Sequence, residues 1–120
     1  MATILLVEDT PANLALASKL LRAAGHEVLT TDTGADGIAL ARDRLPDLVL
    51  MDLGLPDMDG WQALREIRAD PRGADLRVVA FTADAMIGDR VRALAGGFDG
   101  YMSKPIDFAT FAQTVEGYLR

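Results

Sequence analysis

Residues 47–60 read DLVLMDLGLPDMDG, and the change of pattern within this stretch decides the fold. Asp47–Met51 contains a continuous apolar run, which is typical of a strand buried on both faces of a parallel sheet. The run ends abruptly at an acid, Asp52. Gly54 and Pro56 follow, and they predict a loop. The stretch therefore predicts a buried strand that delivers a carboxylate to a loop.

The same alternation continues in both directions along the chain. Strands are expected at Thr3–Val7, Glu27–Thr31, Asp47–Met51, Arg77–Phe81 and Asp99–Met102. Helices are expected from Pro11 to Gly25, from Thr33 to about Arg44, from Gly60 to about Ala69, from about Ala85 to Ala95, and from Asp107 to the end. Five strand–helix units in this length predict a parallel α/β sheet with helices on both faces.

Helix starts carry recognisable capping residues. Thr10 is a candidate N-cap before Pro11, and Thr33 with Asp36 resembles a capping box. Asp107 is a good N-cap for the last helix. The expected apolar face of that helix consists of Phe108, Phe111, Ala112, Val115, Tyr118 and Leu119.

Composition limits the possible functions. The 120 residues fit one domain, 1–120, and the net charge of −6 argues against binding nucleic acid. The absence of cysteine rules out disulfides and thiolate metal sites, and the single histidine, His26, is expected in a turn. The N-terminus lacks a signal peptide and no stretch is long enough to span a membrane, so we expect a cytoplasmic protein with no membrane contact. The chain ends with the fifth helix, so no output domain is expected.

Polar residues gather at the predicted carboxyl ends of the strands, where open α/β sheets carry their functional groups. They are Glu8, Asp9, Asp52, Thr82 and Lys104. Three carboxylates in one cleft repel one another unless a cation lies among them, and oxygen ligands suit Mg²⁺. The lysine and the hydroxyl are groups that can hold the oxygens of a transferred phosphoryl. Asp52 is the candidate nucleophile because it stands alone at the end of a central strand.

At this point the chain resembles the response-regulator receiver domains of two-component signalling, along its whole length. The matching segments are Val7-Glu8-Asp9, the run from Met51 to Gly60, Phe81-Thr82-Ala83 and the run from Tyr101 to Ile106. The run from Val7 to Asn13 is most similar to single-domain cell-cycle regulators and to receivers of hybrid histidine kinases. The resemblance implies a flavodoxin-like (βα)5 doubly wound fold with strand order 2-1-3-4-5. It leaves open whether the chain is a stand-alone regulator, which Met1 favours, or an excised receiver.

The resemblance also implies a role for each matching residue of the metal site. Asp52 would accept a phosphoryl group from a sensor histidine kinase or a phosphotransfer protein. Asp9 would bind Mg²⁺ directly, Glu8 would act mostly through water, and the Gly54 backbone carbonyl would be a further ligand. Mn²⁺ could replace Mg²⁺. Asp84, two residues after Thr82, adds negative charge near the site.

Further roles concern the phosphoryl group and its readout. Thr82 and Lys104 would each bind a phosphoryl oxygen, and Lys104-Pro105 would be a cis peptide. Tyr101 would be the switch aromatic that turns inward when Thr82 moves. Downstream proteins would bind the face formed by the fourth helix, the fifth strand and the fifth helix.

Three other functions are compatible with this fold class. A flavin binder of the same fold needs a phosphate loop after the first strand, but Glu8 and Asp9 would repel a phosphate. An aspartate-based phosphatase often needs a second acid where Gly54 stands, so turnover of external phosphoesters is not expected. A docking domain insensitive to phosphorylation is the third alternative. Asp57 and Asp59 are expected to be loop and cap acids rather than metal ligands.

Overall fold

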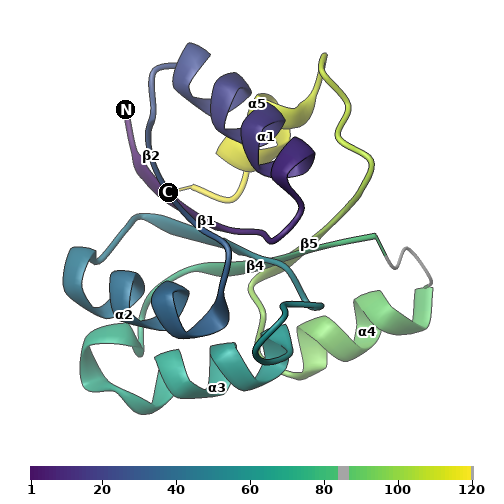
Figure 1. The fold of residues 1–120 in the computed structure, drawn as a ribbon. Helices are drawn as coiled ribbons and strands as arrows, with labels where there is room; N and C mark the ends of the chain where they lie inside the picture. Colours follow the sequence, from purple (N-terminus) through teal and green to yellow (C-terminus); the bar gives the residue numbers. More distant parts are fainter. Residues whose placement is uncertain (84–86, 120) are drawn as a thin grey trace.

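Five parallel strands form one sheet with helices on both faces (Figure 1). The computed structural model describes residues 1–83 and 87–119, so Asp84 lies outside the described residues. The strands are β1 (Thr3–Val7), β2 (Glu27–Thr31), β3 (Leu48–Met51), β4 (Val78–Thr82) and β5 (Gly100–Ser103). The helices are α1 (Pro11–Ala23), α2 (Gly34–Arg44), α3 (Gly60–Ala69), the 3₁₀ turn η1 (Pro71–Gly73), α4 (Ile87–Ala95) and α5 (Phe111–Glu116). The strand order β2-β1-β3-β4-β5 confirms the predicted fold class.

The central strands are apolar on both faces because each face is covered. In β1, Leu5 and Val7 pack toward α2, α3 and α4, whereas Ile4 and Leu6 pack toward α1 and α5. The period of two follows from the alternation of side chains along a strand. Figure 1 shows the two helical layers, with α1 and α5 on one side of the sheet and α2, α3 and α4 on the other.

The parallel register brings the carboxyl ends of the strands to one edge. Val7 at the end of β1 lies beside Met51 at the end of β3. Thr82 at the end of β4 lies beside Ser103 at the end of β5. Residues that directly follow these strands therefore emerge next to one another.

The boundaries of three predicted strands differ by one residue. β3 starts one residue later than predicted, and β4 and β5 both start and end one residue later. Two of the displaced starts, Asp47 and Asp99, bind the backbone of a neighbouring strand with their side chains. The Asp47 carboxylate accepts from the Thr3 amide at 2.8 Å, and the Asp99 carboxylate accepts from the Val78 amide at 2.8 Å.

The prediction that the last helix starts at Asp107 is wrong, because α5 begins at Phe111. The Asp107 carboxylate accepts from the Ala109 amide at 2.9 Å and its carbonyl accepts from the Phe111 amide at 2.9 Å. An aspartate side chain that accepts from the amide two residues ahead occurs in turns as well as at helix starts, and here it stabilises a turn that precedes the helix. Phe108 is consequently 71 % exposed instead of belonging to the buried face, while Phe111 and Val115 are buried.

The other capping predictions have mixed outcomes. The Thr33 hydroxyl accepts from the Asp36 amide at 3.2 Å, which confirms the cap of α2. Thr10 occupies the N-cap position of α1, but its side chain makes no capping hydrogen bond.

His26 is buried: its Nδ1 accepts from the Ala2 amide at 3.1 Å and its Nε2 lies 2.8 Å from Glu116 Oε2. This histidine therefore joins the chain start to α5.

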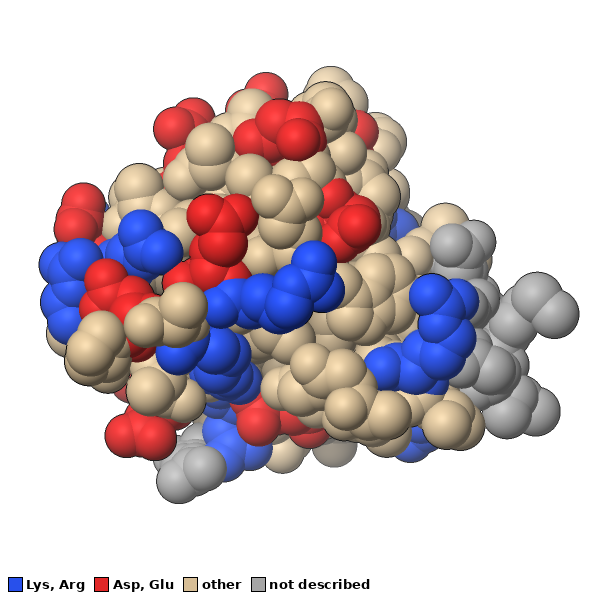
Figure 2. Space-filling model, turned by 90° about the horizontal axis from the view of Figure 1, so that it is seen from below, with Lys and Arg blue, Asp and Glu red and all other residues tan. Residues whose placement is uncertain are grey.

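The surface of the α2–α3–α4 layer mixes basic and acidic side chains (Figure 2). Asp70 is a centre of this pattern, since it forms ion pairs with Arg72 at 3.0 Å and with Arg42 at 3.4 Å. Hydrogen bonding to Arg72 lowers the pKa of Asp70 to about 2.

Within residues 1–83 and 87–119, no helix has the length and apolar character needed to cross a bilayer.

Asp70→Asn should destabilise the protein at pH 7 and not at pH 2. The folded-state pKa of Asp70 is about 2, below the ordinary value of about 3.9. The stabilisation is therefore present above about pH 4 and is lost as the pH falls toward 2. Thermal unfolding from pH 7 to pH 2 measures this. Asp75→Asn, at an exposed position, is the control, and a constant difference between Asp70→Asn and wild type at every pH would contradict the assignment.

Candidate functional site

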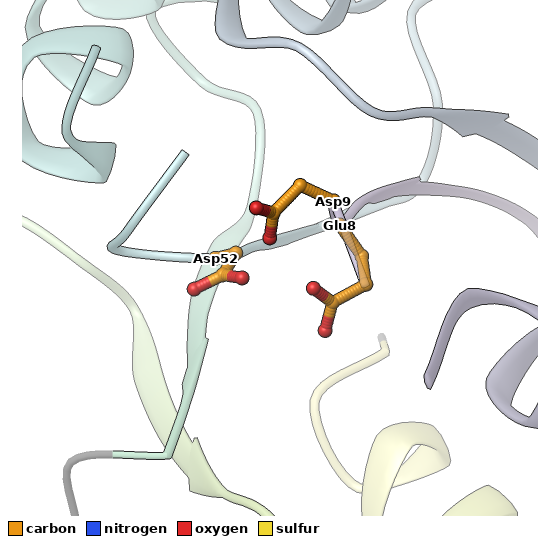
Figure 3. Close-up of side chains that lie close together, drawn as sticks. All are labelled: Glu8, Asp9 and Asp52. Carbon is orange, nitrogen blue, oxygen red and sulfur yellow. The ribbon is translucent and has the colours of Figure 1, made fainter. Parts of the chain in front are cut away.

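Three carboxylates converge at the carboxyl edge of the sheet (Figure 3). Glu8 and Asp9 follow β1 and Asp52 follows β3. One oxygen from each of these residues lies within 4.8 Å of the others. The backbone sets this arrangement, because the Glu8 amide donates to the Thr31 carbonyl and the Asp52 amide to the Val7 carbonyl, each at 3.0 Å. The sheet ladder thus extends one residue past the strands and fixes where each acid begins.

Lys104 supplies the positive charge of this site. Its ammonium lies 3.1 Å from Asp52 Oδ2 and also forms an ion pair with Glu8. The same Nζ atom stands 5.0 Å from the centre of the Phe81 ring, within the range of a cation–π contact. Its backbone amide donates to the Thr82 carbonyl at 2.8 Å, which carries the sheet ladder beyond β5. A largely buried cation therefore balances two largely buried carboxylates.

Burial and pairing shift the pKa values of Glu8 and Asp52 in opposite directions. Burial raises the pKa of Glu8, whose side chain is fully enclosed, and Lys104 offsets only part of that rise. Burial also opposes ionisation of Asp52, but Glu8, the Gly54 amide and Lys104 together hold the pKa of Asp52 below its ordinary value. Asp52 is therefore kept as a carboxylate, which is the form that a nucleophile requires.

The donor set fits a hard divalent cation. It consists of carboxylate oxygens alone, and Asp9 is exposed while Glu8 and Asp52 are buried. Mg²⁺ and Mn²⁺ prefer oxygen ligands and retain several waters, which the exposed side could supply. Glu8, Asp9 and Asp52 are thus the residues that could hold such an ion.

The remaining predicted residues lie at the same edge or beside it. Thr82 is the last residue of β4 and is 4 % exposed. Gly54 donates its amide to Asp52 Oδ1 at 3.0 Å. The Lys104–Pro105 peptide bond is cis, as the resemblance implied. Tyr101 is half-buried on β5 and packs against the core of the α2–α3–α4 layer.

Close backbone contacts around Asp52 were not evident from the sequence. A Cβ added to Gly60 would lie 2.6 Å from the Asp52 carbonyl oxygen and 2.9 Å from the Leu53 Cα. α3 therefore starts directly against the phosphoacceptor candidate's backbone. The Asp59 carboxylate caps this helix by accepting from the Gln62 amide at 2.8 Å, so Asp59 is a cap acid as predicted. The ion pair between Lys104 and Glu8 was also missed, since Lys104 was assigned only to a phosphoryl group.

Gly60→Ala should destabilise the protein by about 1–3 kcal/mol, the usual cost of overpacking. Its new methyl group would meet backbone atoms of residues 52 and 53, which cannot move aside cheaply. Gly54→Ala is the matched control, because a Cβ there meets nothing within 4 Å. Urea unfolding of both variants measures the difference, and equal stabilities would refute the close contact.

Comparisons with known proteins find related sequences and structures. The family model described as response regulator receiver domain matches residues 4–116. The polar-differentiation response regulator DivK of Brucella abortus is 38 % identical over 117 residues, which cover 98 % of this chain and 95 % of that protein. The receiver domain of the Pseudomonas aeruginosa sensor histidine kinase PA1611, solved with a magnesium ion in its active-site cleft, has a TM-score of 0.87 and 36 % identity, covering 98 % of this chain and 96 % of that one. The Mn²⁺-bound response regulator Rcp1 has a TM-score of 0.77 and 27 % identity, covering 98 % and 91 %.

Proposed function

The chain belongs to the response regulator receiver family, and we propose that Asp52 accepts a phosphoryl group from a phosphohistidine in a reaction that depends on Mg²⁺. The observation that carries this proposal is the convergence of Glu8, Asp9, Asp52 and Lys104 at one edge of the sheet. The magnesium-bound receiver of PA1611 and the manganese-bound Rcp1 support the choice of ion.

The transfer forms one bond and breaks one. A carboxylate oxygen of Asp52 attacks phosphorus in line, the phosphorus–nitrogen bond of the donor breaks, and the imidazole nitrogen keeps the electron pair. Glu8, Asp9, Asp52 and the Gly54 carbonyl would hold Mg²⁺, which neutralises the carboxylates and the incoming phosphoryl. The lowered pKa of Asp52 keeps the nucleophile ionised.

Lys104 and Thr82 hold the transferred group. Lys104 already reaches Asp52 Oδ2 at 3.1 Å, so its ammonium can pair with a phosphoryl oxygen bonded to Asp52. Thr82, at the end of the adjacent strand, donates its hydroxyl to another oxygen. Phosphorylation adds charge comparable to the roughly −1.5 to −2 of a phosphoserine.

The new charge changes the α4–β5–α5 face, which binds a downstream protein. Thr82 moves toward the phosphoryl group and Tyr101 turns inward, which shifts the population of conformers on this face. A hollow of about 290 Å³ supports this surface as a binding site; its lining includes Tyr101, Ile106 and Phe111. Val91, Leu94 and Phe108 add exposed apolar side chains from the same elements and the loop between them.

The protein acts through protein partners in the cytoplasm rather than as an enzyme on external substrates. The sensor histidine kinase or phosphotransfer protein supplies the phosphoryl group. Gly54 supplies no acid for turnover of other phosphoesters. The net charge of −6 disfavours nucleic acid and anionic membrane surfaces. The 38 % identity to a response regulator across nearly its full length supports a signalling role for the domain.

Intact mass after incubation with acetyl phosphate and Mg²⁺ tests the phosphoacceptor. Wild type should gain one phosphoryl group, because the ionised Asp52 and Lys104 are already in place. Asp52→Asn should gain none, and neither should wild type with EDTA. A docking domain insensitive to phosphorylation would instead show no modified wild-type protein with acetyl phosphate or with a phosphohistidine donor.

Tyr101→Ala should separate phosphorylation from its readout. The variant should gain the phosphoryl group as wild type does, because Tyr101 lies outside the cluster around Asp52. The phosphorylation-induced amide shifts of α4 and α5, followed by NMR, should shrink, consistent with losing part of a coupling of ~1–3 kcal/mol. Tyr101→Phe, which keeps the ring, should retain them. Full-sized shifts in Tyr101→Ala would exclude the switch role.

A further inference from the structure

At the carboxyl edge of the sheet, which carries the site, the loop after β3 contacts the start of α2, and phosphoryl transfer does not use this contact. Asp57, in the loop between β3 and α3, accepts from the Gly34 amide at 2.8 Å with Oδ1 and from the Ala35 amide at 2.9 Å with Oδ2. Gly34 and Ala35 are the first residues of α2. These two backbone amides hold the pKa of Asp57 below its ordinary value. One ionised side chain thus ties the loop after β3 to the start of α2.

The start of α2, which forms one side of this contact, packs on β1. A Cβ on Gly37 would lie 2.8 Å from Cγ2 of Val7, so the first turn of α2 packs directly on the last residue of β1. Val7 immediately precedes Glu8 and Asp9. Met58 reinforces the contact, since a Cβ on Gly34 would lie 2.5 Å from Met58 Cγ.

The loop end of the contact leads to Asp52 and Gly54. The loop is closed at its base, where the Gly60 amide donates to the Leu53 carbonyl at 2.9 Å and Gly54 pairs with Asp59 in an antiparallel bridge. Asp57 stands at the tip of this closed loop. The Gly54 amide in turn donates to Asp52 Oδ1 at 3.0 Å.

We propose that Asp57 is a positioning residue that fixes the opening between Asp9 on one side and Asp52 with Gly54 on the other, and thereby sets the affinity for Mg²⁺. This inference rests on the proposed function. The β1–β3 ladder fixes the base of the opening, and the Asp57 contact fixes its rim. Both carboxylate oxygens of Asp57 are engaged by amides, so it holds the rim without acting as a further metal ligand.

A purely stabilising helix cap is the alternative explanation, and the two explanations predict different effects of replacing Asp57. Thr33 already caps α2 through the Asp36 amide. Asp57 serves the two preceding amides from a different loop, 23 and 22 residues away in sequence. A cap alone would change the stability of the fold, whereas a rim contact changes the affinity for the ion.

Titration of the wild-type protein and of Asp57→Ala with Mg²⁺ alone, followed by the amide shifts of Asp9 and Gly54, tests the proposal. Asp57→Ala should weaken Mg²⁺ binding by about tenfold, the lower end of what outer-shell partners of metal sites contribute. Asp57→Asn keeps one acceptor oxygen and should fall between the two. Urea unfolding of each variant records the change in stability separately.

Asp75→Ala is the matched control, because it removes the same charge from an exposed position before β4, at the opposite edge of the sheet. Its Mg²⁺ affinity should equal that of wild type at ~0.15 M salt, where exposed charges are screened beyond about 8 Å.

Equal affinities of wild type and Asp57→Ala would overturn the proposal while leaving the proposed function intact. So would equal losses in Asp57→Ala and Asp75→Ala. Failure of the wild type to bind Mg²⁺ would overturn the proposed function itself. If Asp57→Ala does not fold, Asp57→Asn against Asp75→Asn decides the question by the same criteria.

Discussion

Repulsion among Glu8, Asp9 and Asp52 is the constraint around which this structure is organised. Two like charges about 4 Å apart repel by about 4 kcal/mol at an effective dielectric constant of 20. The protein gathers three such groups at one edge and sets Lys104 against two of them. Removing one partner of a buried pair leaves an uncompensated charge, which is strongly unfavourable. The positions of Lys104 and of the acids are therefore mutually dependent.

Rigid, apolar strands make this arrangement possible. The side chains of β1, β3 and β4 are almost entirely buried, so the register of these strands cannot slip without exposing the core. The hydrogen-bond ladder then continues one residue beyond β1, β3 and β5, to Glu8, Asp52 and Lys104. Gly37 and Gly60 allow helices to approach the ends of these strands closely. The hydrophobic packing of the strands thus determines the distances between the charged side chains that follow them.

The contrast between apolar strands and the charged groups that follow them explains what the sequence could predict. Apolar runs that end at polar residues predicted the strands and the grouping of Glu8, Asp9, Asp52 and Lys104 at one edge, because those features follow from strand periodicity and parallel topology. The strand order was implied by the resemblance to receiver domains. The start of α5 was predicted wrongly, because Asp107 can cap a turn as well as a helix, and only the fold selects between them. The ion pair of Lys104 with Glu8 and the hydrogen bonds of Asp57 to the start of α2 were also not predictable, because they depend on how side chains and loops pack once the strands are in place.

Tyr101 and Lys104 connect the site to α4 and α5, the two helices of the proposed binding face. On one face of the sheet, Tyr101 packs against the core that includes Ala93 of α4. On the other, the Lys104 ammonium lies over the Phe81 ring, whose centre is 5.8 Å from that of Phe111 at the start of α5. If Lys104 takes a new partner, its ammonium moves relative to the Phe81 ring. The cation–π attraction then changes, because it depends on the position of the cation. Phe81 thus lies between the cation of the candidate site and Phe111, the first residue of α5.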